Sequence, residues 1–480
     1  MKRIAIIGGG ISGVTAAFEL SRLQRDGESL EFTLYESDDR LGGIVRTRHA
    51  ILSGVGHCVV ELGPDGWVSG KTWARDLAVE LGLESDLVPS NDAERRTLLL
   101  CDGKLEAIPD GMRMMVPLDD DGIRNSSILS ANARKEYLQE PGRAAELRRV
   151  AAETTGDISV ADFVRRHFGE EATRTFAGPL LAGIFGGDIE KLSARSVMPF
   201  FITIEREHGS LIAGLRAQRD ARDSTAAPPA IFTSLRAGLS SLIDAMVEQL
   251  PASSFRMRHP VLSLARDSAD WIITSAAGTE RYRAVLLATP AHVTRTLLFE
   301  VDRELSDLHD IPTSSAVLVA LVYDGKIDLP AAFGFLVHEA GQKFHPALLA
   351  GTFSQNKYPH TTPAPAMQFR VFFGGPHISQ VEELDDDAIA QLAQQQLRHL
   401  FPEIPAADLV IVQRWPNSLP QYEIGHENRV REIESHVAAL PGLHLLGNAY
   451  RGVGLPDMVR RAREQARASA ARNANPSRIL

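Results

Sequence analysis

The sequence predicts an α/β domain combined with an α+β domain and a helical insert, on three observations. The apolar, β-branched run Lys2–Ile7 leads directly into a glycine-rich turn and a helical pattern over residues 14–23, which is typical of a parallel sheet. Strand-like runs vanish over residues 117–192, where charge-rich helical patterns replace them. Strand-like runs between residues 314 and 374 then indicate an antiparallel sheet with helices.

The glycine-rich turn has the spacing of a dinucleotide cradle. Gly8, Gly10 and Gly13 form a GxGxxG pattern, and Glu36 follows a second strand over residues 31–35. Gly8 permits a tight turn, Gly10 lets the backbone approach a pyrophosphate, and Gly13 lets the helix pack on the strand. The helix N-terminus offers N–H groups to phosphates, and an acid at this distance accepts ribose hydroxyls. These elements predict a Rossmann-like fold; the alternative is a glycine-rich turn that binds no ligand.

A second glycine turn selects the dinucleotide. Arg40, Gly42 and Gly43 follow Glu36 closely, which places a cation and a close-approaching backbone beside the same pyrophosphate. NAD-dependent dehydrogenases do not usually carry this signature, whereas flavoproteins with tightly held FAD do. The chain therefore resembles the superfamily of amine oxidases and phytoene desaturases, and FAD is the expected cofactor.

Composition excludes several other classes of protein. The net charge of −10 argues against nucleic acid as a partner. The two cysteines, Cys58 and Cys101, are far apart and form no CxxC motif, so we expect no metal site, iron–sulfur cluster or disulfide framework. The first strand follows the initiator Met directly, and no run of eighteen apolar residues occurs, so neither a signal peptide nor a membrane-spanning helix is expected.

Further motifs narrow the resemblance. They are residues 63–65 (GPD), 179–193 (PLLAGIFGGDIEKLS), 233–239 (TSLRAGL), 415–426 (WPNSLPQYEIGH) and 447–457 (GNAYRGVGLPD). Together with the FAD fingerprint, they resemble oxygen-dependent porphyrinogen oxidases of haem biosynthesis, over residues 3–470. Amine oxidases and phytoene desaturases share the opening and closing motifs, but not the runs over residues 179–193 and 415–426.

The resemblance implies three folded parts that alternate along the chain. The FAD domain would be discontinuous, built from residues 1–85, 228–292 and 405–480. The substrate domain, with an antiparallel sheet, would comprise residues 86–110, 200–227 and 293–404, where residues 217–230 form a linker. The helical insert, residues 111–199, would correspond to the region that attaches membrane-bound relatives to the bilayer. Because the insert carries many charges, as in residues 133–149, we expect weak membrane contact or none.

The resemblance also implies cofactor contacts. Those for the pyrophosphate are Gly8, Gly9, Gly10, Ile11, Ser12 and Gly13, with Arg40, Gly42, Gly43 and Ile44 on the second phosphate side. Those for the adenosine end are Glu36, Ser37 and Val261. Those near the flavin ring and ribityl chain are Gly63, Pro64, Asp65, Gly66, Trp415, Val453, Gly454 and Leu455.

The implied substrate contacts are fewer. Gly183 matches a glycine over which one pyrrole lies, and Phe333, Gly334 and Leu336 match the segment that sandwiches the macrocycle. The alternative for Phe333 and Leu336 is ordinary strand core. Relatives place an arginine on the strand before the Asp102-Gly103 turn, where this chain has Thr97. Arg96 and Lys71 are therefore the candidate cations for a propionate.

The implied reaction is oxidation of a porphyrinogen by FAD and O₂ with release of H₂O₂. Flavin N5 accepts the hydride, so no side chain is named as a certain catalytic residue. Protoporphyrinogen IX is the first choice because few cations are visible for extra carboxylates, and coproporphyrinogen III is the alternative. The rivals are an amine-type flavin oxidase and a non-catalytic binder with this fold. We expect a cytoplasmic monomer or homodimer, peripheral to the membrane's inner face at most, with ferrochelatase or another haem-pathway enzyme as partner.

Overall fold

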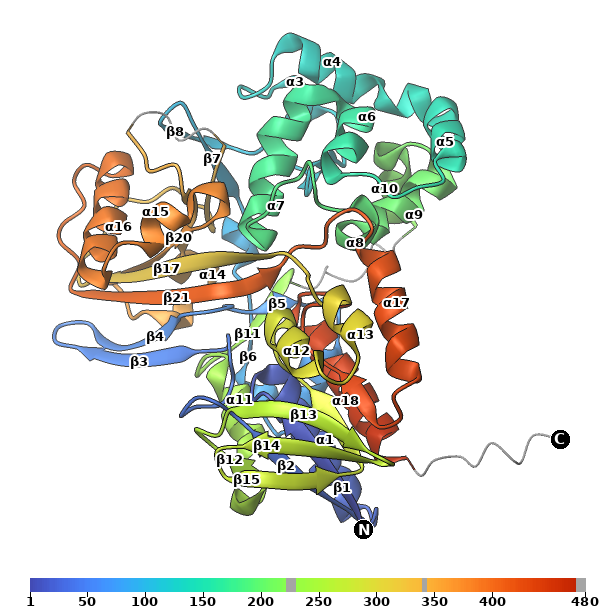
Figure 1. Cartoon of the computed structure of the whole chain (residues 1–480). Coiled ribbons are helices and arrows are strands. Elements are labelled where there is room, and N and C mark those ends of the chain that lie inside the picture. The colour runs from blue at the N-terminus through green and yellow to red at the C-terminus, as the bar shows by residue number, and fades with distance from the viewer. Residues whose placement is uncertain (222–229, 339–342, 472–480) are drawn as a thin grey trace.

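The computed structural model describes residues 1–221, 230–338 and 343–471, which form three parts (Figure 1). A parallel-sheet domain lies at the bottom of the view, a mixed-sheet domain at the left, and a layer of helices at the top. The predicted α/β plus α+β class is therefore confirmed. The predicted linker, residues 217–230, begins in the last turn of a helix that ends at Asp220 and otherwise lies mostly outside the described residues.

The parallel-sheet domain has strand order β12-β2-β1-β16-β22. The strands are β1 (Lys2–Ile7), β2 (Leu30–Tyr35), β12 (Phe255–Arg256), β16 (Ala284–Leu287) and β22 (Leu443–Leu445). Strand β15 (Gly278–Tyr282) ends two residues before β16 begins and belongs to a separate antiparallel meander, so the chain changes sheets at Arg283.

Both faces of the parallel sheet are covered, as its continuous apolar strands require. Ile4 and Ile6 of β1 face one core, with α1 (Ile11–Arg25), α2 (Trp73–Glu80), α11 (Ser240–Val247) and α18 (Leu455–Ala470). Ala5 and Ile7 face the other core. It contains residues of the meander β13 (Val261–Asp267), β14 (Asp270–Ser275) and β15, and of α12 (Ala291–Leu298), α13 (Arg303–Leu308) and α17 (His426–Ala438).

The mixed-sheet domain has strand order β21-β17-β20-β19-β18-β7-β8. The strands are β7 (Thr97–Cys101), β8 (Lys104–Ala107), β17 (Thr313–Tyr323), β18 (Gly334–Val337), β19 (Leu348–Phe353), β20 (Met367–Phe373) and β21 (Leu409–Pro420). Neighbours are antiparallel except β18 and β7, so the predicted antiparallel sheet is mixed at one junction. Helix α16 (Asp386–Leu400) covers one face, and the hairpin β3 (Thr47–Leu52) and β4 (Gly56–Glu61) covers the other.

Two domain boundaries differ from the sequence prediction. Strand β21 pairs with β17 and so belongs to the mixed sheet, although residues after 405 were expected in the FAD domain. The helical layer continues past residue 199, because Leu211 and Ile212 lie in its core. Its helices are α3 (Asp121–Arg124), α4 (Ala131–Gln139), α5 (Ala144–Glu153), α6 (Val160–Ala172), α7 (Gly178–Phe185), α8 (Ala194–Val197), α9 (Pro199–His208) and α10 (Leu211–Asp220). Within the described ranges, no helix has the length and apolarity needed to cross a membrane.

Short elements complete the described fold. The strands β5 (Trp67–Val68), β6 (Leu87–Pro89) and β11 (Phe232–Leu235) form a small antiparallel sheet. Strands β9 (Met112–Arg113) and β10 (Val116–Pro117) pair with each other. Helices α14 (Ser354–Lys357) and α15 (Ser379–Glu382) connect strands of the mixed-sheet domain.

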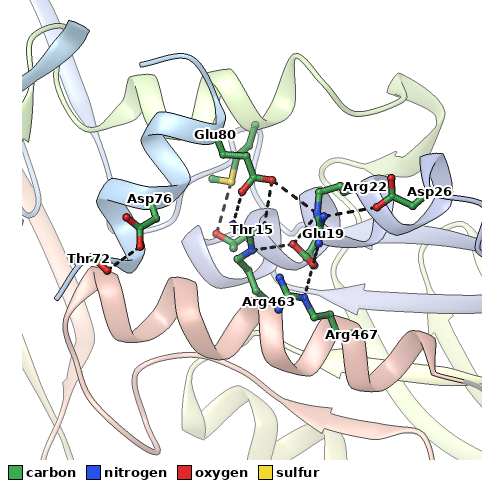
Figure 2. A network of polar contacts seen from close by, with 10 residues as sticks. Thr15, Glu19, Arg22, Asp26, Thr72, Asp76, Glu80, Arg463 and Arg467 are labelled. Carbon is green, nitrogen blue, oxygen red and sulfur yellow. Dashed lines mark hydrogen bonds and ion pairs between the residues drawn. The ribbon is translucent and has the colours of Figure 1, made fainter. Parts of the chain in front are cut away.

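A buried carboxylate joins the first helix to the last (Figure 2). Glu19 of α1 is fully buried and lies 2.6 Å from Arg467 Nε and 2.8 Å from Arg463 Nε, both on α18. Arg22 binds the same carboxylate at 2.6 Å, and Arg463 also binds Glu80 of α2 at 2.6 Å. Burial alone would raise the pKa of Glu19, but hydrogen bonds from Arg22 and Arg467 outweigh it and hold this pKa below its ordinary value.

We predict that Glu19→Gln destabilises the protein by about 2–3 kcal/mol, because buried ion-pair partners lose their counter-charge. Since the pKa of Glu19 is lowered in the folded state, its contribution is present above the unfolded pKa and is lost as pH falls through the folded value. Urea unfolding at neutral pH measures the difference. The control is Glu153→Gln in an exposed pair with Arg149, which should change stability by less than about 0.5 kcal/mol. Equal effects of the two substitutions would contradict this prediction.

Candidate active site

The first glycine turn is a backbone cradle between β1 and α1. Gly8 has a φ of +103°, and a side chain there would meet the carbonyl of Ala288. A Cβ at Gly13 would overlap the Gly8 carbonyl oxygen, whereas a Cβ at Gly10 would have only Gly43 Cα nearby, at 3.9 Å. Gly8 and Gly13 are therefore required by the fold itself, and Gly10 leaves open the space above the turn.

The N-terminus of α1 fits a bound phosphate. No acidic residue lies in its first turn, and its cap residue Gly10 offers no side chain to the free N–H groups. The hydroxyl of Ser12 is buried and has no hydrogen-bond partner among the described residues. An unpartnered buried hydroxyl beside free N–H groups matches what a pyrophosphate would satisfy. Glu36 lies at the end of β2, where one carboxylate oxygen accepts the N–H of Gly9 at 2.6 Å.

The second glycine turn packs directly on the first. The N–H of Gly42 donates to the carbonyl of Gly9 at 2.8 Å, and a Cβ on Gly43 would lie 3.0 Å from Gly10 Cα. The structure thus brings together the two turns that were expected to share one pyrophosphate. The guanidinium of Arg40 donates to carbonyls within its own turn, including Val45 at 3.3 Å, so here it holds the turn's shape.

Other predicted cofactor residues lie along the same path. Val261 begins β13, two residues after His259, whose N–H donates to the carbonyl of Glu36 at 2.8 Å. The Ser37 hydroxyl donates to the Glu36 carboxylate at 3.0 Å. A Cβ at Gly63 would overlap the carbonyl of Ile44, so these two predicted contacts touch. Trp415 closes over this point, since its Nε1 donates to the carbonyl of Leu62 at 2.7 Å.

The loop over residues 63–66 carries a charge cluster that the sequence did not reveal. Asp65 lies 2.8 Å from Lys357 Nζ and 2.8 Å from Arg370 Nη1. Burial alone would raise the pKa of the Asp65 carboxyl, but Lys357 and Arg370 outweigh it and hold that pKa below its usual range. Arg370 also donates to the carbonyl of Gly63. The only sequence signal was a lone arginine in the apolar strand β20.

A cavity of about 690 Å³ opens between the parallel-sheet domain and the helical layer. Its walls come from the loop after β4, the residues before α2, the ends of α7 and α8, and the starts of α17 and α18. Predicted cofactor residues in the wall are Ile44, Pro64, Asp65, Gly66, Val453, Gly454 and Leu455. Apolar side chains such as Val68, Ile184 and Phe185 face it as well. This size suits a cofactor ring together with a sizeable ligand.

Lys71 lines the cavity but is not a free cation. Its Nζ lies 2.5 Å from Asp457 in the first turn of α18. Arg96 does not line the cavity; its side chain is 61% exposed and lies 3.8 Å from Asp110. Neither predicted propionate cation is therefore poised for that role in this structure.

Of the four predicted macrocycle contacts, Gly183 and Leu336 meet on facing elements, and none of the four lines the cavity itself. A Cβ at Gly183 of α7 would approach Leu336 Cδ2 of β18 to 3.0 Å, and Ile184 next to it lines the cavity. Phe335 packs into the sheet core, whereas neither Phe333 nor Leu336 belongs to a described core cluster. Gly334 has a φ of +154° and presses against the backbone of β19. The strand-core alternative therefore fits Phe335 rather than its two neighbours.

Two aromatic side chains in the cavity wall stack on each other. The rings of Tyr422 and His426 lie 4.0 Å apart with an interplanar angle of 13°. Burial lowers the pKa of His426 to about 4, and its Nε2 lies 3.0 Å from the carbonyl of Tyr450. Since a carbonyl only accepts, Nε2 carries the proton, and the imidazole is neutral near pH 7. Both residues belong to the sequence motif over residues 415–426.

A second, small cavity of about 10 Å³ lies behind the loop and has room for about one water. It is lined by Glu61, Tyr358, His360 and Arg370 among others. The Tyr358 hydroxyl and both His360 nitrogens are buried without partners among the described residues. Burial raises the pKa of Glu61 to about 7, against hydrogen bonds from the Leu239 N–H and the Thr47 hydroxyl.

The cradle, the second glycine turn and the adjoining cavity define a flavin-dependent oxidoreductase. The chain belongs to the family of flavin-containing amine oxidoreductases, whose profile matches residues 11–472. The predicted FAD cofactor is thereby confirmed, and so is the prediction that the protein is an enzyme. Within the described residues, no group of three or more histidine, cysteine or acidic side chains could hold a metal ion.

Individual relatives are similar over almost the whole chain. The coproporphyrinogen III oxidase of Bacillus subtilis is 29% identical, with 95% of this chain and 96% of that protein covered. The coproporphyrinogen III oxidase of Propionibacterium freudenreichii is 30% identical, with 96% and 90% covered. A crystal structure from Exiguobacterium sp. 255-15, provisionally named a protoporphyrinogen oxidase, has a TM-score of 0.85 and 30% identity, with 98% of each chain covered.

When bound, FAD supplies a two-electron acceptor, and the protein supplies position and environment. The glycine turns and the first turn of α1 would hold the pyrophosphate. The second turn, with Arg40, would shape the path to the loop over residues 63–66. That loop and residues 453–455 would flank the ring, where α18 presents the positive end of its dipole.

We predict that Gly10→Val folds but purifies with less than about a tenth of the wild-type flavin, because its side chain fills the pyrophosphate space. The structure leaves 3.9 Å around a Cβ there, so the melting temperature should stay within about 3 °C of wild-type apoprotein. Flavin absorbance and thermal melts measure both quantities. Gly13→Val is the matched control and should unfold, because its Cβ overlaps the Gly8 carbonyl oxygen. A yellow, active Gly10→Val protein would refute the assignment.

We predict that the Glu61 carboxyl makes the free energy of unfolding fall as pH rises. Its pKa of about 7 when folded exceeds the ordinary glutamate value, so the folded state holds an extra proton between about pH 4.5 and 7. Stability should therefore fall by up to about 3 kcal/mol as pH rises from 5 to 8. Glu61→Gln should flatten that part of the profile in urea unfolding with excess FAD, whereas Glu153→Gln should leave it unchanged. Parallel profiles for wild type and Glu61→Gln would contradict this prediction.

Proposed function

We propose that this enzyme oxidises a porphyrinogen, coproporphyrinogen III, to the corresponding porphyrin. Two observations together carry the proposal. The flavin cradle adjoins a cavity of about 690 Å³, and coproporphyrinogen III oxidases at 29% and 30% identity match the chain over almost its whole length. The reaction removes electrons in three two-electron steps, each through the flavin, with O₂ as the acceptor and H₂O₂ as the product. Gain of macrocyclic aromaticity drives it.

The cavity supports a large, partly apolar substrate with anionic groups. Apolar side chains such as Val68, Ile184 and Phe185 suit a macrocycle, and cationic side chains lie in the same wall. Gly183 and Leu336 are already in contact, so the macrocycle would lie in the cavity against Ile184, beside the place where Gly183 meets the segment with Phe333, Gly334 and Leu336, rather than between them. The neutral His426 and the stacked Tyr422 would face its edge.

Protoporphyrinogen IX, the first choice from the sequence, is the second candidate. It is favoured by the name of the Exiguobacterium relative, at 30% identity and a TM-score of 0.85. The two substrates differ in charge, since coproporphyrinogen III carries two more propionates. Of the further cations that line the cavity, Lys357 and Arg451 are paired with carboxylates and Arg195, within the described ranges, is not, so the structure offers one available cation that the sequence did not suggest. An available cation in the wall suits the more anionic substrate.

We propose that the protein acts in haem biosynthesis and in the cytoplasm. A haem-pathway enzyme such as ferrochelatase stays the predicted partner, because the product porphyrin must be passed to an enzyme that inserts a metal. The mixture of exposed apolar and charged side chains around the helical layer, including Phe200 and Met114, leaves weak membrane contact as part of the same prediction.

We expect a kcat/KM for coproporphyrinogen III at least about tenfold above that for protoporphyrinogen IX, a difference of about 1.4 kcal/mol in transition-state binding. Porphyrin fluorescence and O₂ uptake by the FAD-loaded protein measure both reactions, with simple amines as the control substrates. A tenfold preference in the other direction would replace coproporphyrinogen III by protoporphyrinogen IX. Amine turnover without porphyrinogen turnover would overturn the proposed function altogether.

A further inference from the structure

The cations in the wall of the large cavity are nearly all paired with carboxylates. Lys71 lies 2.5 Å from Asp457, and Lys357 lies 2.8 Å from Asp65, a carboxylate that Arg370 shares. Arg451 forms two hydrogen bonds with Glu434, at 2.8 and 2.6 Å. Because each of these cations already binds a carboxylate of the protein, it is less available to an anionic ligand.

Arg195 is the exception. It lines the same cavity, and no carboxylate of the described residues lies within 4.0 Å of its guanidinium. One of its N–H groups donates to the carbonyl of Gly156 at 2.8 Å, which orients the side chain. A guanidinium has five N–H donors, so several stay available. Glu427 also lines the cavity, but its charge acts on Arg451.

The backbone that carries Arg195 is held firmly on both sides. Ser193 caps α8 by accepting the N–H of Ser196 at 3.0 Å, and its own N–H donates to the carbonyl of Tyr422 at 2.7 Å. The N–H of Ala194 donates to the carbonyl of Ile158 at 2.9 Å. Because α8 is tied to both the helical layer and the loop before α17, Arg195 is positioned at the junction of these parts rather than on a free surface.

We propose that Arg195 binds a propionate carboxylate of the macrocycle, an inference that rests on the proposed porphyrinogen oxidation. An ionised propionate entering the cavity needs a cation that is not already neutralised, and a guanidinium binds a carboxylate through two parallel hydrogen bonds. Arg195 therefore takes the place that Lys71 and Arg96 were expected to fill. It is a substrate-binding and specificity-determining residue that takes no part in hydride transfer.

The test compares FAD-loaded wild type, Arg195→Gln and Arg195→Lys. For Arg195→Gln, we expect the Kd for coproporphyrin III, from fluorescence titration, and the KM for coproporphyrinogen III to rise about tenfold, as for loss of one charge-assisted contact. The kcat should stay within about twofold, because the contact is present in both ground and transition states. Arg195→Lys should lie between the two, since it keeps the charge without the fork. Arg149→Gln, which removes one partner of an exposed ion pair on α5, is the matched control and should leave the Kd, the KM and the kcat unchanged.

An uncharged ligand separates loss of the carboxylate contact from loss of the folded cavity. If Arg195 binds a carboxylate, coproporphyrin III tetramethyl ester should bind wild type and Arg195→Gln equally, with both ligands measured in one detergent buffer. If Arg195→Gln unfolds through loss of the Gly156 contact, the test uses two other measurements of the Kd for coproporphyrin III. This Kd should be higher for Arg195→Lys than for wild type, and the wild-type Kd should rise with salt concentration. Equal loss of ester and acid binding, or a Kd within about twofold of wild type for both variants, would overturn the inference alone. A wild-type protein that neither binds coproporphyrin nor oxidises porphyrinogens would overturn the proposed function, and this inference with it.

Discussion

The contact between the first and the last described helix brings two walls of the cofactor site together. Glu19 on α1 binds Arg463 and Arg467 on α18, and apolar residues of both helices share one core cluster (Figure 2). The N-terminus of α1 forms the pyrophosphate cradle, and the N-terminus of α18 forms a wall of the large cavity. Two positive helix ends are therefore brought to one anionic cofactor by a charge pair remote from it.

Paired charges also line the large cavity. Asp65 and Asp457 each bind a lysine in the wall, and Asp65 binds Arg370 as well, so most ions that line the cavity are already paired. Such pairs cost less to bury than free ions. Glu61 differs, because no cation lies within ion-pair distance among the described residues and its carboxyl is held by two hydrogen-bond donors. Its raised pKa is the result of that difference.

The sequence predicted the local, glycine-dependent parts of the fold well. The turns at Gly8 to Gly13 and at Asp102-Gly103 depend on backbone conformations that few residues adopt, with φ of +103° at Gly8 and +49° at Asp102, so the residues themselves reveal them. The long-range parts were less accessible. The pairing of Lys357 with Asp65 joins residues almost three hundred positions apart, and no spacing rule indicates it. The parallel pairing of β18 with β7 was missed for the same reason.

The position of β1 within its sheet has a consequence for how the chain is made. Strand β1 is synthesised before its neighbour β16, which begins at Ala284, and before the edge strand β22, which begins at Leu443. A nascent chain on the ribosome therefore carries an apolar strand with an open edge until β16 has emerged, and the α18 wall is made later still. Such delayed, long-range pairing is slow and exposes the nascent strand to aggregation.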